Sequence, residues 1–224
     1  MVAVRYRLVR NLMFAAGVLY CSLLLEALSG YPLDVRNSFL SELGALDQPT
    51  SRYARAMDLA TGVLLLVAAL LSRSAVRLHR DTAGLWISTA VFGAATLFDS
   101  LSPMDCAPSA SVACQAAEAN GQAGVALALH EVTSTLAGLG TIAMSVCAVL
   151  VLRRAGWGGR CSKAAAALAA GVAVTNVWLG IETGLDVLTG NELEAPGILQ
   201  RISVLLVCLM LATVLPALRQ ALSR

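Results

Sequence analysis

Six long apolar runs divide this chain, at residues 12–29, 55–72, 83–101, 124–152, 162–183 and 198–218. Each run approaches the roughly 20 residues that an α-helix needs to cross about 30 Å of hydrocarbon. A composition of 58% hydrophobic and 13% charged residues, with a mean hydropathy of +0.74, excludes a soluble α/β domain. The sequence therefore predicts an all-α membrane bundle of six transmembrane helices. The loops on one side hold only about ten residues each, which favours a single transmembrane domain over residues 1–224.

The basic residues are concentrated on one side of this expected bundle. With six crossings, both termini share a side with loops 73–82 and 153–163. The basic residues on that side are Arg5, Arg7, Arg10, Arg73, Arg77, Arg80, Arg153, Arg154, Arg160, Lys163, Arg219 and Arg224. The other side has only Arg36, Arg52, Arg55 and Arg201, and every acid except Asp81. Because Lys and Arg mark cytoplasmic loops, we expect both termini in the cytoplasm and a multi-pass protein in the inner (plasma) membrane.

Two further expectations follow from the pattern of charge. Arg5, Arg7 and Arg10 precede the first run as they would in a secretory signal, but no small-residue cleavage pattern follows, so we expect an uncleaved first helix. The net charge of +2 sums a basic rim and an acidic rim that face different compartments. It gives no support for a nucleic-acid partner.

The six cysteines fall into two groups. Cys21, Cys147 and Cys208 lie within apolar runs and Cys161 lies on the cytoplasmic side, where thiols stay reduced. Cys106 and Cys114 bracket a short loop on the opposite side, which favours a disulfide worth about 2–3 kcal/mol. A metal pair is the alternative, although this spacing without a histidine cluster is poor zinc geometry.

Two local patterns predict further structure. In the first outer loop, Phe39, Leu40 and Leu43 share one helical face, which predicts a short interfacial helix capped near Asn37 and ending at Gly44. Small residues let membrane helices approach closely. We therefore expect helix contacts at the glycines of the fourth and fifth runs, which are Gly138, Gly140, Gly180 and Gly184.

Three segments together resemble a known family. They are Asn37-Ser-Phe-Leu-Ser-Glu-Leu-Gly-Ala45, Phe98-Asp-Ser-Leu-Ser-Pro-Met-Asp-Cys-Ala-Pro108 with Cys114 after it, and His130-Glu131 at the start of the fourth run. They resemble the DUF998 family of bacterial six-span membrane proteins, in its actinobacterial form, and the resemblance covers most of the chain. It implies the fold and topology but no activity.

Every predicted helix contributes a polar group near its outer end. An ionisable group within the bilayer is costly and by default faces protein or a water-filled cavity. We therefore predict an outward-facing polar cavity that binds or processes a lipid or amphiphilic small molecule. Its candidate ligand-binding residues are Glu26, Glu42, Asp58, Asp105, Glu131, Asn176, Glu182 and Arg201, in addition to Asp99 and His130. The alternative is a structural network in which Arg201 pairs with Glu182, Asp186 or Asp99.

A catalytic role would centre on His130, the single histidine outside the cytoplasmic rim. Asp99 or Asp105 would orient its imidazole, and Ser41, or else Ser100 or Ser102, would be the nucleophile of an outer-leaflet hydrolase or acyl transferase. A zinc hydrolase normally needs several histidines, and neither a metal nor another cofactor is expected, although Asp99, Asp105, His130 and Glu131 are an alternative set of cation ligands.

Two readings without catalysis also remain open. The bundle could be a non-catalytic scaffold or a membrane partner subunit of a cell-envelope enzyme. A transporter is disfavoured, because there is no inverted repeat and no Pro-broken helix at the bilayer midplane.

Overall fold

The computed structural model describes residues 2–75, 80–122, 124–156, 159–189 and 195–222. Arg77 and Arg224 of the basic rim lie outside these residues, and the side chains of Arg73, Arg80, Asp81 and Asp186 are not described either. The described chain is helical and contains no strand. Its long helices are α1 (Val2–Tyr20), α3 (Ser51–Ala75), α4 (Arg80–Leu101), α6 (Gly124–Arg154), α7 (Arg160–Thr189) and α8 (Pro196–Leu222). Its short helices are α2 (Ser22–Leu28), η1 (Leu40–Gly44), η2 (Pro108–Ala110) and α5 (Val112–Ala119).

Six helical segments in the described residues are long and apolar enough to cross a membrane, which confirms the predicted fold class. They are Arg5–Leu28, Ser51–Ser72, Thr82–Leu101, Gly124–Arg154, Arg160–Leu185 and Pro196–Gln220. The first combines α1 and α2, which meet at Cys21, where the backbone leaves the helical conformation. The first helix also begins earlier than residue 12, the start of the predicted run.

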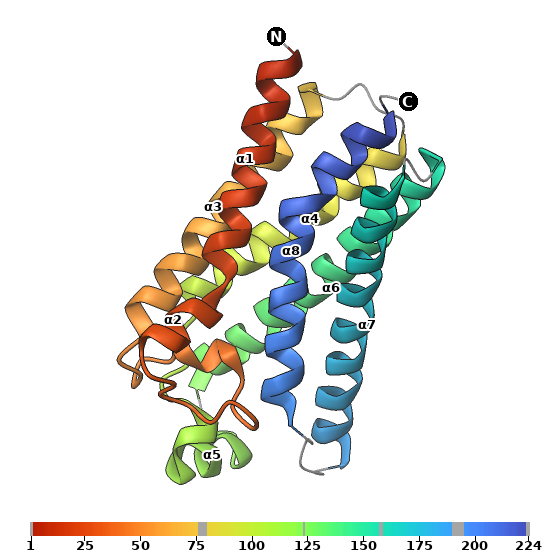
Figure 1. Ribbon diagram of the computed structural model, residues 1–224. Helices are drawn as coiled ribbons and strands as arrows, with labels where there is room; N and C mark the ends of the chain where they lie inside the picture. The colour runs from red at the N-terminus through yellow and green to blue at the C-terminus, as the bar shows by residue number, and fades with distance from the viewer. Residues whose placement is uncertain (1, 76–79, 123, 157–158, 190–194, 223–224) are drawn as a thin grey trace.

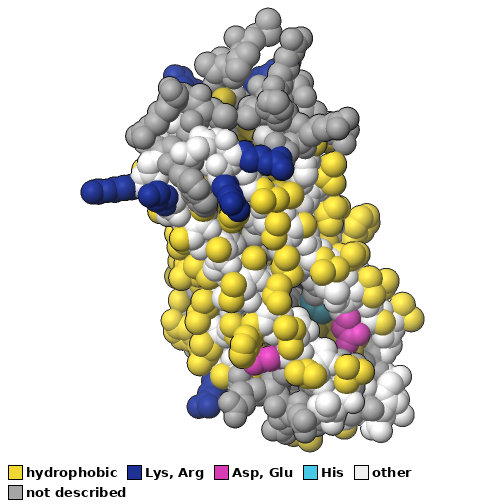
Figure 2. Space-filling view, turned by 90° about the vertical axis from the view of Figure 1, so that its right-hand side faces the viewer, with side chains coloured by type: hydrophobic (Ala, Val, Ile, Leu, Met, Phe, Trp, Pro, Cys, Tyr) yellow, Lys and Arg dark blue, Asp and Glu magenta, His cyan; other side chains and the backbone are white. Residues whose placement is uncertain are grey.

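The spanning helices pack in a ring that follows chain order (Figure 1). α4 lies between α3 and α6, α7 lies between α6 and α8, and α8 closes the ring against α1. Both termini lie at one end of the bundle, which we call the inner end, while α5 and the longer loops lie at the other, the outer end (Figure 1). Figure 2 shows a broad hydrophobic surface between them. That both termini face the cytoplasm remains a prediction.

Glycines permit the closest helix contacts. A Cβ on Gly62 of α3 would lie 2.6 Å from the carbonyl oxygen of Gly93 on α4, and one on Gly140 of α6 would lie 2.8 Å from the amide nitrogen of Phe92. These glycines therefore set the spacing of α3, α4 and α6. The prediction for Gly140 is confirmed.

The other three predicted glycine contacts are wrong. Nothing lies within 4 Å of a Cβ built on Gly138, Gly180 or Gly184. Gly140 faces α4, whereas Gly180 and Gly184 lie on the exposed face of α7. The sequence showed that these residues are small but not which side of each helix faces the bundle.

The predicted interfacial helix also differs from the observed helix η1. η1 is a single 3-10 turn that begins at Leu40 rather than near Asn37, although it does end at Gly44. Leu40 and Leu43 are buried and pack with Val204 and Cys208 of α8. The apolar face of η1 is therefore covered by the bundle, so the first outer loop closes the outer end instead of lying on the membrane surface.

Candidate functional site

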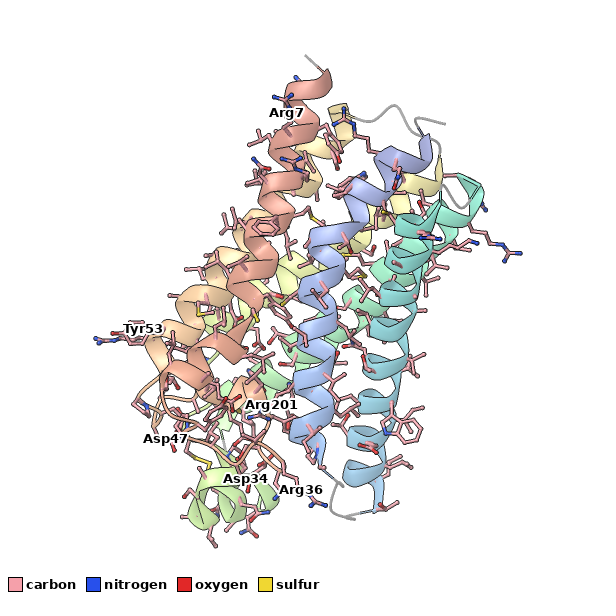
Figure 3. All side chains as sticks on the ribbon, viewed as in Figure 1. Arg7, Asp34, Arg36, Asp47, Tyr53 and Arg201 are labelled. Carbon is pink, nitrogen blue, oxygen red and sulfur yellow. A yellow bond between two sulfur atoms is a disulfide. The ribbon has the colours of Figure 1, made fainter. Side chains whose placement is uncertain are left out.

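A buried ion pair joins the first and last spanning segments. Arg201 of α8 is 7% exposed and Glu26 of α2 is 1% exposed. The Arg201 Nε donates to Glu26 Oε2 at 3.0 Å, and Nη2 pairs with the other carboxylate oxygen. Nη1 donates to the carbonyl oxygens of Ser38 at 2.8 Å and Gly197 at 2.9 Å. Both charged groups are thus occupied within the protein (Figure 3 labels Arg201).

This pairing differs from the predicted partners of Arg201. We expected Glu182, Asp186 or Asp99, whereas the partner is Glu26 because α8 packs beside α1 and α2 at the closure of the ring. Gly197 permits the arrangement, since a Cβ there would lie 2.7 Å from both Arg201 Nη1 and the carbonyl oxygen of Val35.

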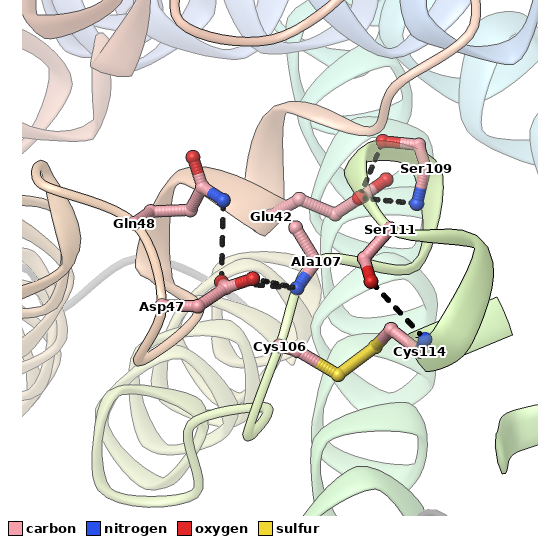
Figure 4. The surroundings of a disulfide bond; sticks show 8 residues. All are labelled: Glu42, Asp47, Gln48, Cys106, Ala107, Ser109, Ser111 and Cys114. Atoms are coloured by element: carbon pink, nitrogen blue, oxygen red, sulfur yellow. Dashed lines mark hydrogen bonds between the residues drawn. A yellow bond between two sulfur atoms is a disulfide. The ribbon is translucent and has the colours of Figure 1, made fainter.

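Glu42 joins the second outer loop to the first by hydrogen bonds. Its Oε1 accepts the backbone N–H of Phe39 at 2.9 Å, and its Oε2 accepts the N–H and hydroxyl of Ser109 at 3.0 and 2.6 Å. The Ser109 hydroxyl also lies 2.7 Å from that of Ser38. The carboxylate is buried and fully hydrogen-bonded (Figure 4), so it is a structural anchor rather than an open ligand.

A second set of hydrogen bonds between the two outer loops lies beside the disulfide (Figure 4). Asp47 accepts the N–H of Ala107 at 3.1 and 3.2 Å, and the N–H of Leu46 donates to the carbonyl oxygen of Met104 at 2.9 Å. The predicted disulfide between Cys106 and Cys114 is present, with Cα atoms 6.1 Å apart. The disulfide ties the segment after α4 to α5 within the second outer loop. Since Glu42, Leu46 and Asp47 bind this loop to the first, the two outer loops form one cap.

Asp34 begins the turn that leads into this cap. Its Oδ1 accepts the backbone N–H groups of Asn37 at 2.9 Å and Arg36 at 2.7 Å. These donors, with that of Asn37 contributing most, hold the pKa of the exposed Asp34 carboxyl below its usual value. The carboxylate therefore stays ionised at neutral pH.

Beneath the cap lies a small polar cavity between α3, α4 and α6. It is lined by Ser41, Gly44, Arg55, Asp58, Asp99, Ser100, Pro103, Met104 and His130. About 10 Å³ is open to the centre of a water molecule, so the cavity has room for roughly one water-sized group. It brings together the three predicted catalytic residues, Ser41, Asp99 and His130.

Asp99 and His130 are in direct contact. His130 Nδ1 lies 3.1 Å from Asp99 Oδ1. The same oxygen accepts the hydroxyl groups of Thr133 at 2.6 Å and Ser134 at 2.9 Å, and Ser134 Oγ lies 3.4 Å from His130 Nε2. Three groups on α6 therefore converge on one carboxylate of α4, which orients the imidazole at the edge of the cavity.

Asp58 differs from the other acids of the outer end. It lies on α3, is half-buried and lines the cavity. No hydrogen bond or ion pair to its carboxylate occurs among the residues that the structure describes. One turn earlier, Arg55 points its Nε at the carbonyl oxygen of Ser100, at 2.9 Å, rather than at Asp58. The cavity thus contains one carboxylate without a partner.

The remaining predicted residues lie apart from the cavity. Asp105 and Glu131 are exposed and do not line it. Asn176 of α7 donates to Ser203 of α8 at 2.8 Å. Glu182 accepts the indole N–H of Trp178 at 2.6 Å, while its Oε2 is buried without a hydrogen-bond partner. The predicted single cavity is therefore divided into separate clusters. Within the described chain, no three His, Cys, Asp or Glu side chains are grouped to hold a metal ion.

Sequence reasoning missed Arg55, which lines the cavity, and two hydroxyl groups that bind its Asp99. Thr133 and Ser134 follow His130 by three and four residues, a spacing that places them on the same face of α6. Arg55 was counted only as an outer-side charge, although it precedes Asp58 by three residues on α3. Helical spacing from the predicted residues could have found all three.

Comparison with known proteins agrees with this architecture. Residues 13–216 match the family described as "Protein of unknown function (DUF998)". No curated protein and no solved structure shows a significant match. Since the matched region covers nearly all of the six-helix bundle, the chain belongs to the DUF998 family.

Proposed function

We propose that the cavity at Asp58, Asp99 and His130 binds the polar end of a lipid or amphiphilic small molecule. The observation that carries this proposal is the Asp58 carboxylate, which faces the cavity without a hydrogen-bond partner while its neighbours are satisfied. A half-buried carboxylate has lost part of its hydration, which is costly where no partner replaces it. A ligand that donates to Asp58 removes that cost, which gives the site its affinity.

The size and charge of the cavity narrow the ligand class. A volume suited to about one water admits a hydroxyl or ammonium group but not a whole headgroup. The two carboxylates of the lining outnumber its one arginine, Arg55, whose Nε already donates to the Ser100 carbonyl oxygen, so the cavity favours a donor or a cation over a phosphate. Arg201 could have favoured a phosphate, but Glu26 and two carbonyl oxygens already occupy it.

The surroundings of the cavity suit an amphiphile. The side chains of Asp99 and His130 retain 17% and 11% exposure, so the site opens to the surface of the bundle. Phe98 and Leu101 of α4 and Leu129 of α6 are exposed apolar side chains nearby in the sequence. Figure 2 shows a histidine and an acidic side chain together among hydrophobic ones. A ligand reaching this site from the membrane keeps its apolar part in lipid.

Lipid retention in nanodiscs tests the proposal. The protein is placed in phosphatidylcholine containing phosphatidylethanolamine, diacylglycerol or phosphatidic acid, and bound lipid is counted by native mass spectrometry. We expect retention of the ammonium and hydroxyl lipids but not of phosphatidic acid. Asp58→Asn should lower that retention at least about ten-fold, since hydrogen bonds to charged groups contribute about 1.5–3 kcal/mol.

Glu131→Gln is the matched control, because Glu131 is exposed and adjacent to His130 in the sequence but does not line the cavity. Equal retention by wild type, Asp58→Asn and His130→Ala would refute ligand binding at this site. Copurification of a protein partner without retained lipid would favour the scaffold or partner-subunit function.

An outer-leaflet hydrolase or acyl transferase is a second candidate. It is favoured by Ser41 lining the same cavity as the Asp99–His130 pair. In that mechanism Ser41 attacks an ester carbonyl while His130 accepts the hydroxyl proton and Asp99 holds the imidazole in place. The ester C–O bond then breaks, the leaving alcohol takes the proton from His130, and water or an acceptor hydroxyl releases the acyl group from Ser41. A fluorophosphonate probe should label wild type but not Ser41→Ala. Labelling that persists in Ser41→Ala and vanishes in Ser134→Ala would reassign the nucleophile.

A further inference from the structure

A second, larger recess lies at the other end of the molecule, between α6 and α7. It is lined by Val149 of α6 and by Lys163, Ala166, Ala167 and Ala170 of α7. The α7 residues are spaced by three and four positions and so form one helix face. Because three of them are alanines, little side chain fills the groove, and about 540 Å³ stays open. The recess is broadly open at the surface of the bundle, so it suits a chain that lies along the helices rather than an enclosed ligand.

The groove is apolar along its length and basic at one end. Lys163 lies at the inner end, three residues after the start of α7, while Ala170 lies two turns further along the helix. Arg160 and Arg153 are exposed at the adjoining helix ends. Figure 2 looks onto this side of the bundle and shows Lys and Arg side chains gathered near its inner end, above hydrophobic ones.

The inner halves of α6 and α7 and their connection contain no acidic residue. Between Glu131 and Glu182 the chain has four basic residues, Arg153, Arg154, Arg160 and Lys163, and no Asp or Glu. An anion beside Lys163 therefore meets only attractive formal charges from this stretch of the chain. A second copy of the chain would bring the same positive charges face to face, which disfavours a dimer through this face.

We propose that this groove binds an anionic phospholipid. One acyl chain lies along Ala166, Ala167 and Ala170, and the phosphate lies beside Lys163 in the leaflet at the inner end. Basic recesses between membrane helices are suited to anionic headgroups, and here the apolar groove continues into the hydrocarbon from the basic end. The site is independent of the outer cavity and takes the opposite charge.

Competitive lipid retention tests this assignment. The protein is placed in nanodiscs of equal phosphatidylcholine and phosphatidylglycerol, and the ratio of retained lipids is measured by native mass spectrometry. We expect phosphatidylglycerol to dominate. Lys163→Gln should lower the ratio about five-fold, the effect of about 1 kcal/mol for a basic residue near an anionic surface. Ala167→Leu, which fills the groove, should lower the retention of both lipids.

Two control variants separate the groove from general charge and bulk. Arg10→Gln removes an exposed charge at the same end of the bundle, on α1, and Ala164→Leu adds bulk to an exposed α7 position that does not line the groove. Both should retain lipid as wild type does. A wild-type ratio near one, or equal losses in Lys163→Gln and Arg10→Gln, would overturn the proposal. A lipid-free dimer that Ala167→Leu abolishes would also overturn it, because a second copy would then fill the groove.

Discussion

Removing one member of the Glu26–Arg201 pair should be among the most destabilising substitutions in this chain. Arg201→Met leaves the Glu26 carboxylate buried without its cation and removes the donor to the carbonyl oxygens of Ser38 and Gly197. Breaking a buried ion pair from one side costs about 3–5 kcal/mol. The buried Ser38 carbonyl oxygen, left without this donor, adds about 1–3 kcal/mol unless water replaces it, whereas the Gly197 oxygen keeps the helical N–H of residue 201. We therefore expect a loss of at least about 3 kcal/mol.

A double-mutant cycle isolates the pair from its surroundings. Glu26→Leu alone leaves Arg201 buried without a counter-charge and should cost about as much as Arg201→Met. The double variant removes both charges, so it should be more stable than either single variant, with a remaining cost of about 1–3 kcal/mol from the Ser38 carbonyl oxygen that has lost its donor. Denaturant unfolding in bicelles measures each free energy. Arg52→Met, at an exposed arginine, should stay within about 0.5 kcal/mol of wild type.

Two outcomes would refute this reasoning. Single variants that lose less than about 1 kcal/mol would mean that the pair is not desolvated as the structure indicates. Additive losses in the double variant would mean that Glu26 and Arg201 act independently.

Three further predictions concern other parts of the bundle. Cys106→Ser should cost about 2–3 kcal/mol of stability, and alkylation of denatured wild type should label four cysteines without reductant and six with it. Gly62→Ala should force α3 from α4 and lower stability by about 1–3 kcal/mol, whereas Gly138→Ala, which meets no neighbour, should be neutral or slightly stabilising in the same unfolding assay. His130→Ala should lower lipid retention while leaving the melting temperature nearly unchanged, but Asp99→Leu should lower both, because it removes the oxygen that accepts two hydroxyl groups of α6.

Local sequence signals were sufficient for the helices and the disulfide. Each spanning helix is encoded by its own apolar run, and no long-range information is needed to find it. Cys106 and Cys114 are close in sequence and share a loop, so their pairing also follows locally. The contact of His130 with Asp99 was also predictable, because the two residues lie near the outer ends of consecutive spanning helices, α4 and α6.

Contacts between residues far apart in the sequence could not be predicted from local patterns. Glu26 and Arg201 are separated by 175 residues, and their contact depends on α8 closing the ring against the first span. No periodicity within either helix specifies that closure. The same limit explains Gly180 and Gly184, whose small size suits a contact that the rotation of α7 does not make. Helix rotation and ring order are collective results of packing and lie outside a single helical pattern.

The polar groups of the outer end form two classes, those with hydrogen-bond or ion-pair partners within the protein and those without. Glu26, Glu42 and Arg201 are buried and fully paired, and they fix the first outer loop between α8 and the second outer loop. Glu42 follows Ser41 directly in η1, so the anchoring that holds one side chain also fixes the position of the other over the cavity. Among the residues lining the cavity that the structure describes, Asp58 is the carboxylate without a partner. The paired acids thus build a rigid cap, and the unpaired one leaves beneath it a charge that a ligand can satisfy.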